Sequence, residues 1–184
     1  MIKEELDSNR IFILHEFLST DECMALIRRS KDFSYETGTV GGVIAEGLRN
    51  NERVLFDDKP LADVLFNRAA LWIPKEIDGH QLVRFNERWR FYRYRAGQTF
   101  QPHRDGAYMS FQTYEQSEVT FMIYLNDEMT GGETRFFLMQ TKPCRDVPTY
   151  RSSRPQEPRW YFCTRFGTKE QSCLAERNTC CERM

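Results

Sequence analysis

The feature that most limits the fold of this chain is a change in the spacing of apolar side chains near Leu82. Before this residue, apolar positions recur every three to four residues, as they do on one face of an amphipathic helix. After it, they alternate every second residue, as they do on a strand with one buried face. Helices followed by several antiparallel strands indicate an α+β chain with a barrel-like or jelly-roll sheet.

The clearest strand is predicted over residues 119–125. One face of this strand carries Val119, Phe121, Ile123 and Leu125, and the other carries Thr120, Met122 and Tyr124. Shorter strands are predicted over residues 11–14, 89–94, 133–137 and 160–162. Because the first face of the 119–125 strand is entirely apolar, we expect it to lie against the core.

Two helices are predicted to pack outside this sheet. Ser19 and Glu22 are spaced as a capping box, in which the serine hydroxyl accepts from a first-turn amide and the glutamate reaches back to the amide of the cap. Pro60 suits the first turn of a second helix, and Pro74 is expected to end it.

Composition narrows the classes of function. A chain of 184 residues with a formal net charge of -1 favours one domain and lacks the basic surface of a nucleic-acid-binding protein. No apolar run approaches the roughly 20 residues of a membrane span, and the charged N-terminus does not resemble a secretory signal. We therefore expect a cytoplasmic protein with no nucleic-acid partner and no membrane partner.

The cysteines carry little information about function. Of six, five lie between residues 144 and 181, and in a reducing cytoplasm we do not expect them to form disulfides. No pair has C-x-x-C spacing, so a zinc-stabilised C-terminal segment is the weakest of the alternatives.

The chemistry of the chain centres on His103-Arg104-Asp105. Residues two apart on a strand point to the same side, so this imidazole and this carboxylate can meet one metal ion. Histidine with a carboxylate, and with positions left open, is the ligand set of the 2-His-1-carboxylate iron sites. Alone, the tripeptide is a weak signal, because H-x-D also occurs by chance in surface turns.

The surrounding motifs make the metal interpretation much more specific. They are Asn86-Glu87, Phe91-Tyr92-Arg93-Tyr94, Gly97-Gln98, Phe100, Asp105-Gly106, Tyr124-Leu125-Asn126 and Gly131-Gly132-Glu133-Thr134 with Phe136. In this order they resemble the catalytic core of the iron(II)- and 2-oxoglutarate-dependent dioxygenases of the prolyl 4-hydroxylase type, as in the catalytic domain of the alpha subunit. The resemblance runs from about Ile11 to Phe137, and it implies a double-stranded β-helix (jelly-roll) core with the N-terminal helices packed outside.

The resemblance also implies residue roles. By it, His103 and Asp105 are two of three iron ligands, and no further catalytic residue is implied. Tyr94 and Tyr124 match positions that line the 2-oxoglutarate pocket, and Thr120 is expected there because it shares a strand face with Tyr124. The plainer interpretation of these three residues is that they are core side chains whose hydroxyls need partners.

The implied reaction is hydroxylation of a peptide or protein substrate at proline. It uses iron(II), 2-oxoglutarate and dioxygen, and it releases succinate and carbon dioxide. L-Ascorbate is the implied reductant that restores the iron. In such enzymes the metal carries the chemistry, and the protein supplies ligands, orientation and shielding.

The chain departs from this family after Phe137. The family needs a second histidine on a later strand and a basic residue beyond it, but the other two histidines here, His15 and His80, both precede the Gly131 turn. We therefore expect residues 1–137 to be an incomplete dioxygenase domain and residues 138–184 an aberrant, poorly ordered tail. The last strands of the sheet are expected to be missing or disordered, and the activity of this chain to be impaired.

A change of reading frame would explain the departure. Read with one fixed offset, the codons of residues 166–170 permit Trp-His-Glu-Gly, where the family has its distal histidine, and those of residues 176–184 permit a lysine-bearing strand. We hypothesise that the chain leaves its ancestral frame near Phe137 or Leu138. The nucleotide sequence of the gene decides this.

The sequence therefore supports two alternative classes of function. The first is a dioxygenase by descent, and the second is a catalytically dead peptide-binding module on the same fold. Decarboxylation of 2-oxoglutarate in the presence of iron(II) separates them.

Overall fold

The computed structural model describes residues 1–7, 10–40, 43–44, 47–103, 105–126, 129–138, 145–146, 160–164 and 173–178. Over these residues the chain forms two helices, α1 (Thr20–Ser30) and α2 (Lys59–Ala69), and many short strands. Neither of these helices is long and apolar enough to cross a membrane. The mixture of a few helices with antiparallel sheets agrees with the predicted α+β class.

The strands form three larger antiparallel sheets over the described residues. The first has the order β1-β2-β14-β11, from β1 (Ile2–Asp7), β2 (Ile11–His15), β14 (Trp160–Thr164) and β11 (Val119–Ile123). The second has the order β10-β15-β12-β13, from β10 (Thr99–His103), β15 (Cys173–Asn178), β12 (Thr134–Leu138) and β13 (Arg145–Asp146). The third has the order β3-β6-β9, from β3 (Glu36–Thr37), β6 (Glu52–Asp57) and β9 (Arg88–Arg93). Short hairpins join β4 (Thr39–Val40) to β5 (Val43–Ile44) and β7 (Glu76–Ile77) to β8 (His80–Gln81).

Both helices begin as their sequences predict. The backbone amide of Glu22 donates to Ser19 Oγ at 3.2 Å, and the amide of Ser19 donates to the Glu22 carboxylate at 2.8 Å, so the capping box is confirmed. Helix α2 has Pro60 in its first turn, and its cap, Asp58, accepts from a first-turn amide at 2.8 Å. This helix ends at Ala69, one turn earlier than Pro74 indicates.

An ion pair fastens the two helices to each other. The Arg68 guanidinium of α2 donates to the Glu22 carboxylate of α1 at 2.7 Å and to the carbonyl of Phe17 at 2.9 Å. The hydrogen bond from Arg68 lowers the pKa of Glu22 to about 2. The capping carboxylate therefore both closes the first turn of α1 and binds α2.

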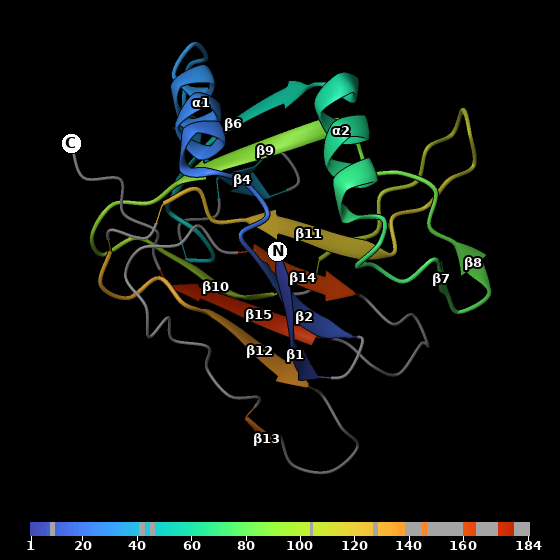
Figure 1. The fold of residues 1–184 in the computed structure, drawn as a ribbon. Coiled ribbons are helices and arrows are strands. Elements are labelled where there is room, and N and C mark those ends of the chain that lie inside the picture. The colour runs from blue at the N-terminus through green and yellow to red at the C-terminus, as the bar shows by residue number, and fades with distance from the viewer. Residues whose placement is uncertain are drawn as a thin grey trace.

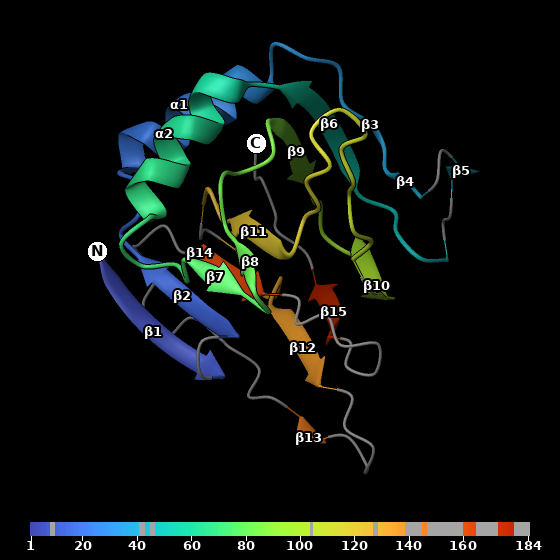
Figure 2. The same cartoon turned by 90° about the vertical axis from the view of Figure 1, so that its right-hand side faces the viewer.

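The core lies between the helices and the first sheet. Its buried cluster includes Phe12 and Leu14 of β2 and Leu65 of α2. The apolar face of β11, consisting of Val119, Phe121, Ile123 and Leu125, packs against this cluster, as the alternation predicts. Figures 1 and 2 show both helices at the same end of the molecule, on the outside of the sheets.

The C-terminal segment differs from our expectation at two places. The structure describes β14 between β2 and β11, and β15 between β10 and β12, so these strands are not missing. Strand β14 was predicted from residues 160–162, but β15 has no regular alternation. It pairs because an open sheet edge offers backbone donors and acceptors to any extended segment, whatever its side chains. Residues 166–170, which would carry the shifted histidine codon, lie outside the described residues.

Candidate metal and co-substrate site

The two predicted metal ligands come together at the end of β10. His103 is the last residue of this strand, and Asp105 follows two positions later. The imidazole Nε2 lies 3.2 Å from the Asp105 Oδ1 atom. The side chains thus converge as the H-x-D pattern predicts, although Asp105 itself lies beyond the end of the strand.

The imidazole is oriented from its other side. His103 Nδ1 lies 2.9 Å from the backbone carbonyl oxygen of Gln101, so Nδ1 carries the proton and donates. The other ring nitrogen, Nε2, is then the atom that faces Asp105. The ring also stacks on Phe100, with centroids 3.8 Å apart, which fixes its plane. Orientation of this kind is typical of a metal-ligating histidine.

The carboxylate is oriented by Thr120 on β11. The threonine hydroxyl donates to Asp105 Oδ2 at 2.6 Å, while Oδ1 remains facing His103. We expected Thr120 to face the 2-oxoglutarate pocket. It does line the same cavity, but its hydroxyl is engaged by the carboxylate, so in this structure it positions Asp105.

These two residues fit a divalent metal ion. Two metal–ligand bonds of about 2.1 Å at right angles place the ligand atoms about 3.0 Å apart, close to the 3.2 Å between Nε2 and Oδ1. Two ligand atoms with lone pairs at this separation repel each other unless a cation or a proton lies between them. The described residues hold no cluster of three metal-binding side chains, so this part of the chain brings two such side chains to the site.

The other histidines lie elsewhere, as their sequence positions predict. His15 on β2 bonds to Glu4 of β1, with 2.7 Å between Nε2 and the carboxylate, so its role is structural. His80 on β8 is exposed, although it does line the wide cavity next to the metal site.

A cavity of about 1230 Å³ contains the candidate site. Its walls include all five predicted site residues, namely His103, Asp105, Tyr94, Thr120 and Tyr124. Tyr94 is buried just after β9. Tyr124 follows β11 and hydrogen-bonds through its hydroxyl to Thr134 of β12, which is fully buried. The tyrosines therefore bring hydroxyl groups to a wall that mixes apolar and polar side chains.

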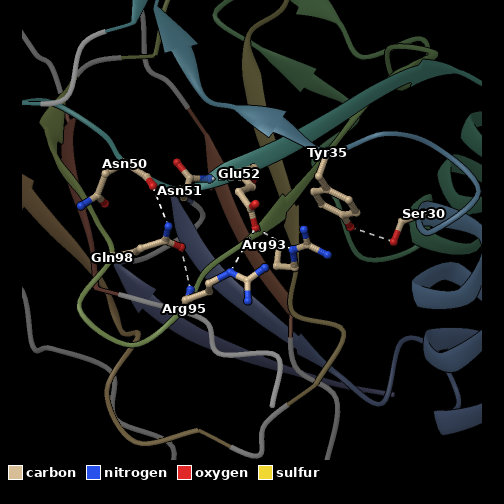
Figure 3. A network of polar contacts seen from close by, with 8 residues as sticks. All are labelled: Ser30, Tyr35, Asn50, Asn51, Glu52, Arg93, Arg95 and Gln98. Atoms are coloured by element: carbon tan, nitrogen blue, oxygen red, sulfur yellow. Dashed lines mark hydrogen bonds and ion pairs between the residues drawn. The ribbon is translucent and has the colours of Figure 1, made fainter. Parts of the chain in front are cut away.

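A polar network holds the turn that leads into β10. Glu52 on β6 accepts from Arg93 at 2.8 Å and pairs with Arg95 at 3.5 Å, and the hydrogen bond from Arg93 is the main cause of the lowered pKa of Glu52. Gln98 accepts from the Arg95 amide at 2.7 Å and donates to the Asn50 carbonyl at 2.8 Å (Figure 3). Because β10 begins immediately after this turn, the network also fixes the position of His103.

Arg49 is a cavity residue that our sequence reasoning missed. Its guanidinium is buried, donates from Nε to Asn51 Oδ1 at 3.0 Å, and lies 4.9 Å above the ring of Tyr92. An arginine in a glycine-rich, irregular stretch gives no periodic signal of burial. Only its neighbours in three dimensions identify it.

A converging histidine and carboxylate, inside a tyrosine-lined cavity between β-sheets, define a candidate mononuclear metal site. A protein-family model described as the 2OG-Fe(II) oxygenase superfamily matches residues 89–163, which include all five predicted site residues. The match continues past residue 137, where we predicted that the resemblance ends, and it stops before residues 166–184.

Individual relatives agree with the family match. The chain is 25% identical to prolyl 4-hydroxylase 1 of Arabidopsis thaliana over 147 residues, which is 74% of this chain and 50% of that protein. It is 29% identical over 131 residues to the probable prolyl 4-hydroxylase 3 of the same plant, which is 69% of this chain and 45% of that protein. The predicted resemblance is confirmed: the chain is similar to the 2-oxoglutarate- and iron(II)-dependent oxygenases of the prolyl 4-hydroxylase type.

A solved structure supports the fold. A prolyl 4-hydroxylase from Pseudomonas putida matches with a TM-score of 0.55 and 18% identity, over 92% of this chain and 89% of that one. At this identity the likeness concerns the fold alone. The chain spans about half the length of the curated relatives that it matches.

Proposed function

We propose that the chain is an iron(II)- and 2-oxoglutarate-dependent dioxygenase that hydroxylates prolyl residues in a peptide or protein. The observation that carries this proposal is the convergence of His103 Nε2 and Asp105 Oδ1 at 3.2 Å inside the cavity. The similarity to prolyl 4-hydroxylases supports the choice of substrate class. We further propose that the first and second sheets are the two halves of a double-stranded β-helix, with the N-terminal helices packed outside it.

Each site residue has a distinct task in this proposal. Bound iron(II) supplies the coupling of 2-oxoglutarate decarboxylation, which releases succinate and carbon dioxide, to oxidation of a C–H bond by dioxygen. His103 is the neutral ligand and Asp105 the anionic one. Thr120 holds the carboxylate in place, and Tyr94 and Tyr124 line the co-substrate pocket. L-Ascorbate is the proposed reductant that keeps the iron divalent.

The low number of ligands favours a second candidate. The described residues provide two metal-binding side chains at the site rather than three, which weakens metal binding. We therefore propose that the activity of this chain is impaired. In the alternative, the chain is a catalytically dead module that retains the cavity for binding a peptide.

Succinate release by the purified chain tests the function. With iron(II), 2-oxoglutarate and ascorbate, we expect slow but measurable succinate production that His103→Ala abolishes. His80→Ala is the matched control, because His80 lines the same cavity but is exposed and distant in sequence from Asp105; it should leave the rate unchanged. Metal-independent succinate production, or a full rate in His103→Ala, would contradict the proposed site. No production from a folded, metal-binding chain would favour the dead module.

We also propose that residues 1–137 form the dioxygenase domain and that residues 138–184 are an aberrant tail that arose by a change of reading frame. The support is that one fixed offset permits both the histidine segment at residues 166–170 and the lysine-bearing strand at residues 176–184. The gene sequence from residue 137 onward tests it directly: bases that cannot spell histidine across the codons of Gly167 and Thr168 exclude it. Cytoplasmic location stays a prediction from the sequence.

A further inference from the structure

The Arg49 side chain is a buried cation with unused hydrogen-bonding capacity. It is 4% exposed, and its Nη2 has no hydrogen-bond partner among the residues that the structure describes. Its single side-chain hydrogen bond in this part of the chain runs from Nε to the neutral amide of Asn51. No described carboxylate forms an ion pair with it.

A buried guanidinium is costly without a counter-charge. The rings of Phe100 and Tyr92, at 4.3 and 4.9 Å from the guanidinium carbon, offset part of this cost by cation–π attraction. They leave the Nη2 donor unsatisfied. The ligand that best satisfies a planar, forked guanidinium is a carboxylate, which it binds with two parallel hydrogen bonds.

The position of Arg49 relates it to the metal site. Phe100 contacts both groups, with its centroid 4.3 Å from the guanidinium carbon and 3.8 Å from the imidazole centroid of His103. These two distances limit the separation of the guanidinium carbon from the imidazole to about 8 Å. Arg49 also pairs with Phe100 through the backbone, so its position relative to β10 is fixed. Both Arg49 and His103 line the cavity.

We propose that Arg49 binds the carboxylate of 2-oxoglutarate that is remote from the metal. This rests on the proposed function, because it assumes that the 2-oxoacid end of the molecule lies at His103 and Asp105. A five-carbon diacid held there has its second carboxylate four bonds from the first, a reach that suits a guanidinium within this limit. Arg49 then supplies, from the segment before β6, the positive charge that the family takes from a basic residue beyond its second histidine.

The test compares two ligands that differ in this carboxylate alone. Binding of 2-oxoglutarate and of 2-oxopentanoate to the full chain is measured by calorimetry, without oxygen and with manganese(II) in place of iron. We expect the wild type to bind 2-oxoglutarate at least about tenfold more tightly. In Arg49→Gln the two affinities should differ by less than about twofold, with 2-oxopentanoate binding little changed; Arg49→Lys should retain part of the preference.

Two further variants control for charge and folding. Arg90→Gln removes the same charge from an exposed position on the cavity wall and should keep the wild-type preference. Gly38→Ala keeps Arg49 but places a methyl group 2.8 Å from its Cζ and 2.9 Å from its Nη2, which displaces the guanidinium. We expect Gly38→Ala to lose the preference for 2-oxoglutarate over 2-oxopentanoate. This variant therefore tests the proposal even if Arg49→Gln fails to fold.

Each outcome decides the proposal. A wild-type preference that survives in Arg49→Gln overturns it, as does equal binding of the two acids by the wild type. If Arg49→Gln instead weakens binding of a glutamate-containing peptide alone, the arginine recognises a substrate carboxylate and the proposal is again wrong. Manganese binding that persists in His103→Ala marks failure of the proposed function itself, and this is seen without any 2-oxoacid.

Discussion

Thr120 gives the most specific prediction about the metal site. Its hydroxyl donates to Asp105 Oδ2 at 2.6 Å, and this is the hydrogen bond that turns Oδ1 toward His103. Thr120→Val removes the hydroxyl while keeping the shape and strand preference of the side chain. The carboxylate then rotates more freely, so we expect weaker metal binding without loss of the fold.

The size of the effect follows from the exposure of the carboxylate. A hydrogen bond to an ionised group contributes about 1.5–3 kcal/mol when it is buried. The Asp105 side chain is 42% exposed, so solvent screening reduces the contribution to about 1 kcal/mol. This corresponds to about fivefold weaker metal binding.

Manganese(II) titration followed by electron paramagnetic resonance measures the change. Thr113→Val is the matched control, because the Thr113 hydroxyl also donates to a carboxylate, that of Glu115, at 3.0 Å. That carboxylate faces Arg84 rather than the metal site. Manganese affinity that is equal in Thr120→Val and Thr113→Val would refute the positioning role of Thr120.

Two more predictions concern α1. The pKa of Glu22 is lowered to about 2 by Arg68, so the ion pair stabilises the fold above the ordinary carboxyl pKa of 4.5, and this contribution disappears as the pH falls toward 2. The ion pair should account for no more than about 1 kcal/mol of the cost of Arg68→Met at pH 7, because it is partly exposed. The difference from wild type in urea unfolding should shrink toward pH 2, where only the lost bond to the Phe17 carbonyl remains; a constant difference at all pH values would contradict it. Burial, and secondarily the charge of Glu22, raises the pKa of the Cys23 thiol to about 11, so peptide mass spectrometry should find Cys23 unmodified by iodoacetamide at pH 8 until urea unfolds the chain. Modification in the folded protein at the rate of a free thiol would show the opposite.

The parts of the fold that the sequence predicts are those in which local pattern and burial agree. The β11 strand has one apolar face because that face packs on the core. The capping box forms because both of its hydrogen bonds lie within one turn. The side chains of His103 and Asp105 converge as the alternation of a strand predicts, although Asp105 lies just beyond the end of β10.

The unpredicted parts depend on contacts between distant segments. Strand β15 is held by the open edges of β10 and β12, which its own residues do not reveal. Arg49 is buried because Phe100 and Tyr92 cover it from strands far along the chain. Thr120 was assigned to the correct face of β11, but its bond to Asp105 depends on how the segment after β10 turns toward β11.

The most direct test of the metal site is spectroscopic. Iron(II) chelated by a 2-oxoacid gives a visible metal-to-ligand absorption band. The band forms only when the protein holds the iron and the iron holds the 2-oxoacid, and it needs no turnover. Under anaerobic conditions we predict this band in the wild type and in His80→Ala, and its loss in His103→Ala and Asp105→Ala. A band of wild-type intensity in either of the last two variants would show that His103 and Asp105 do not hold the metal.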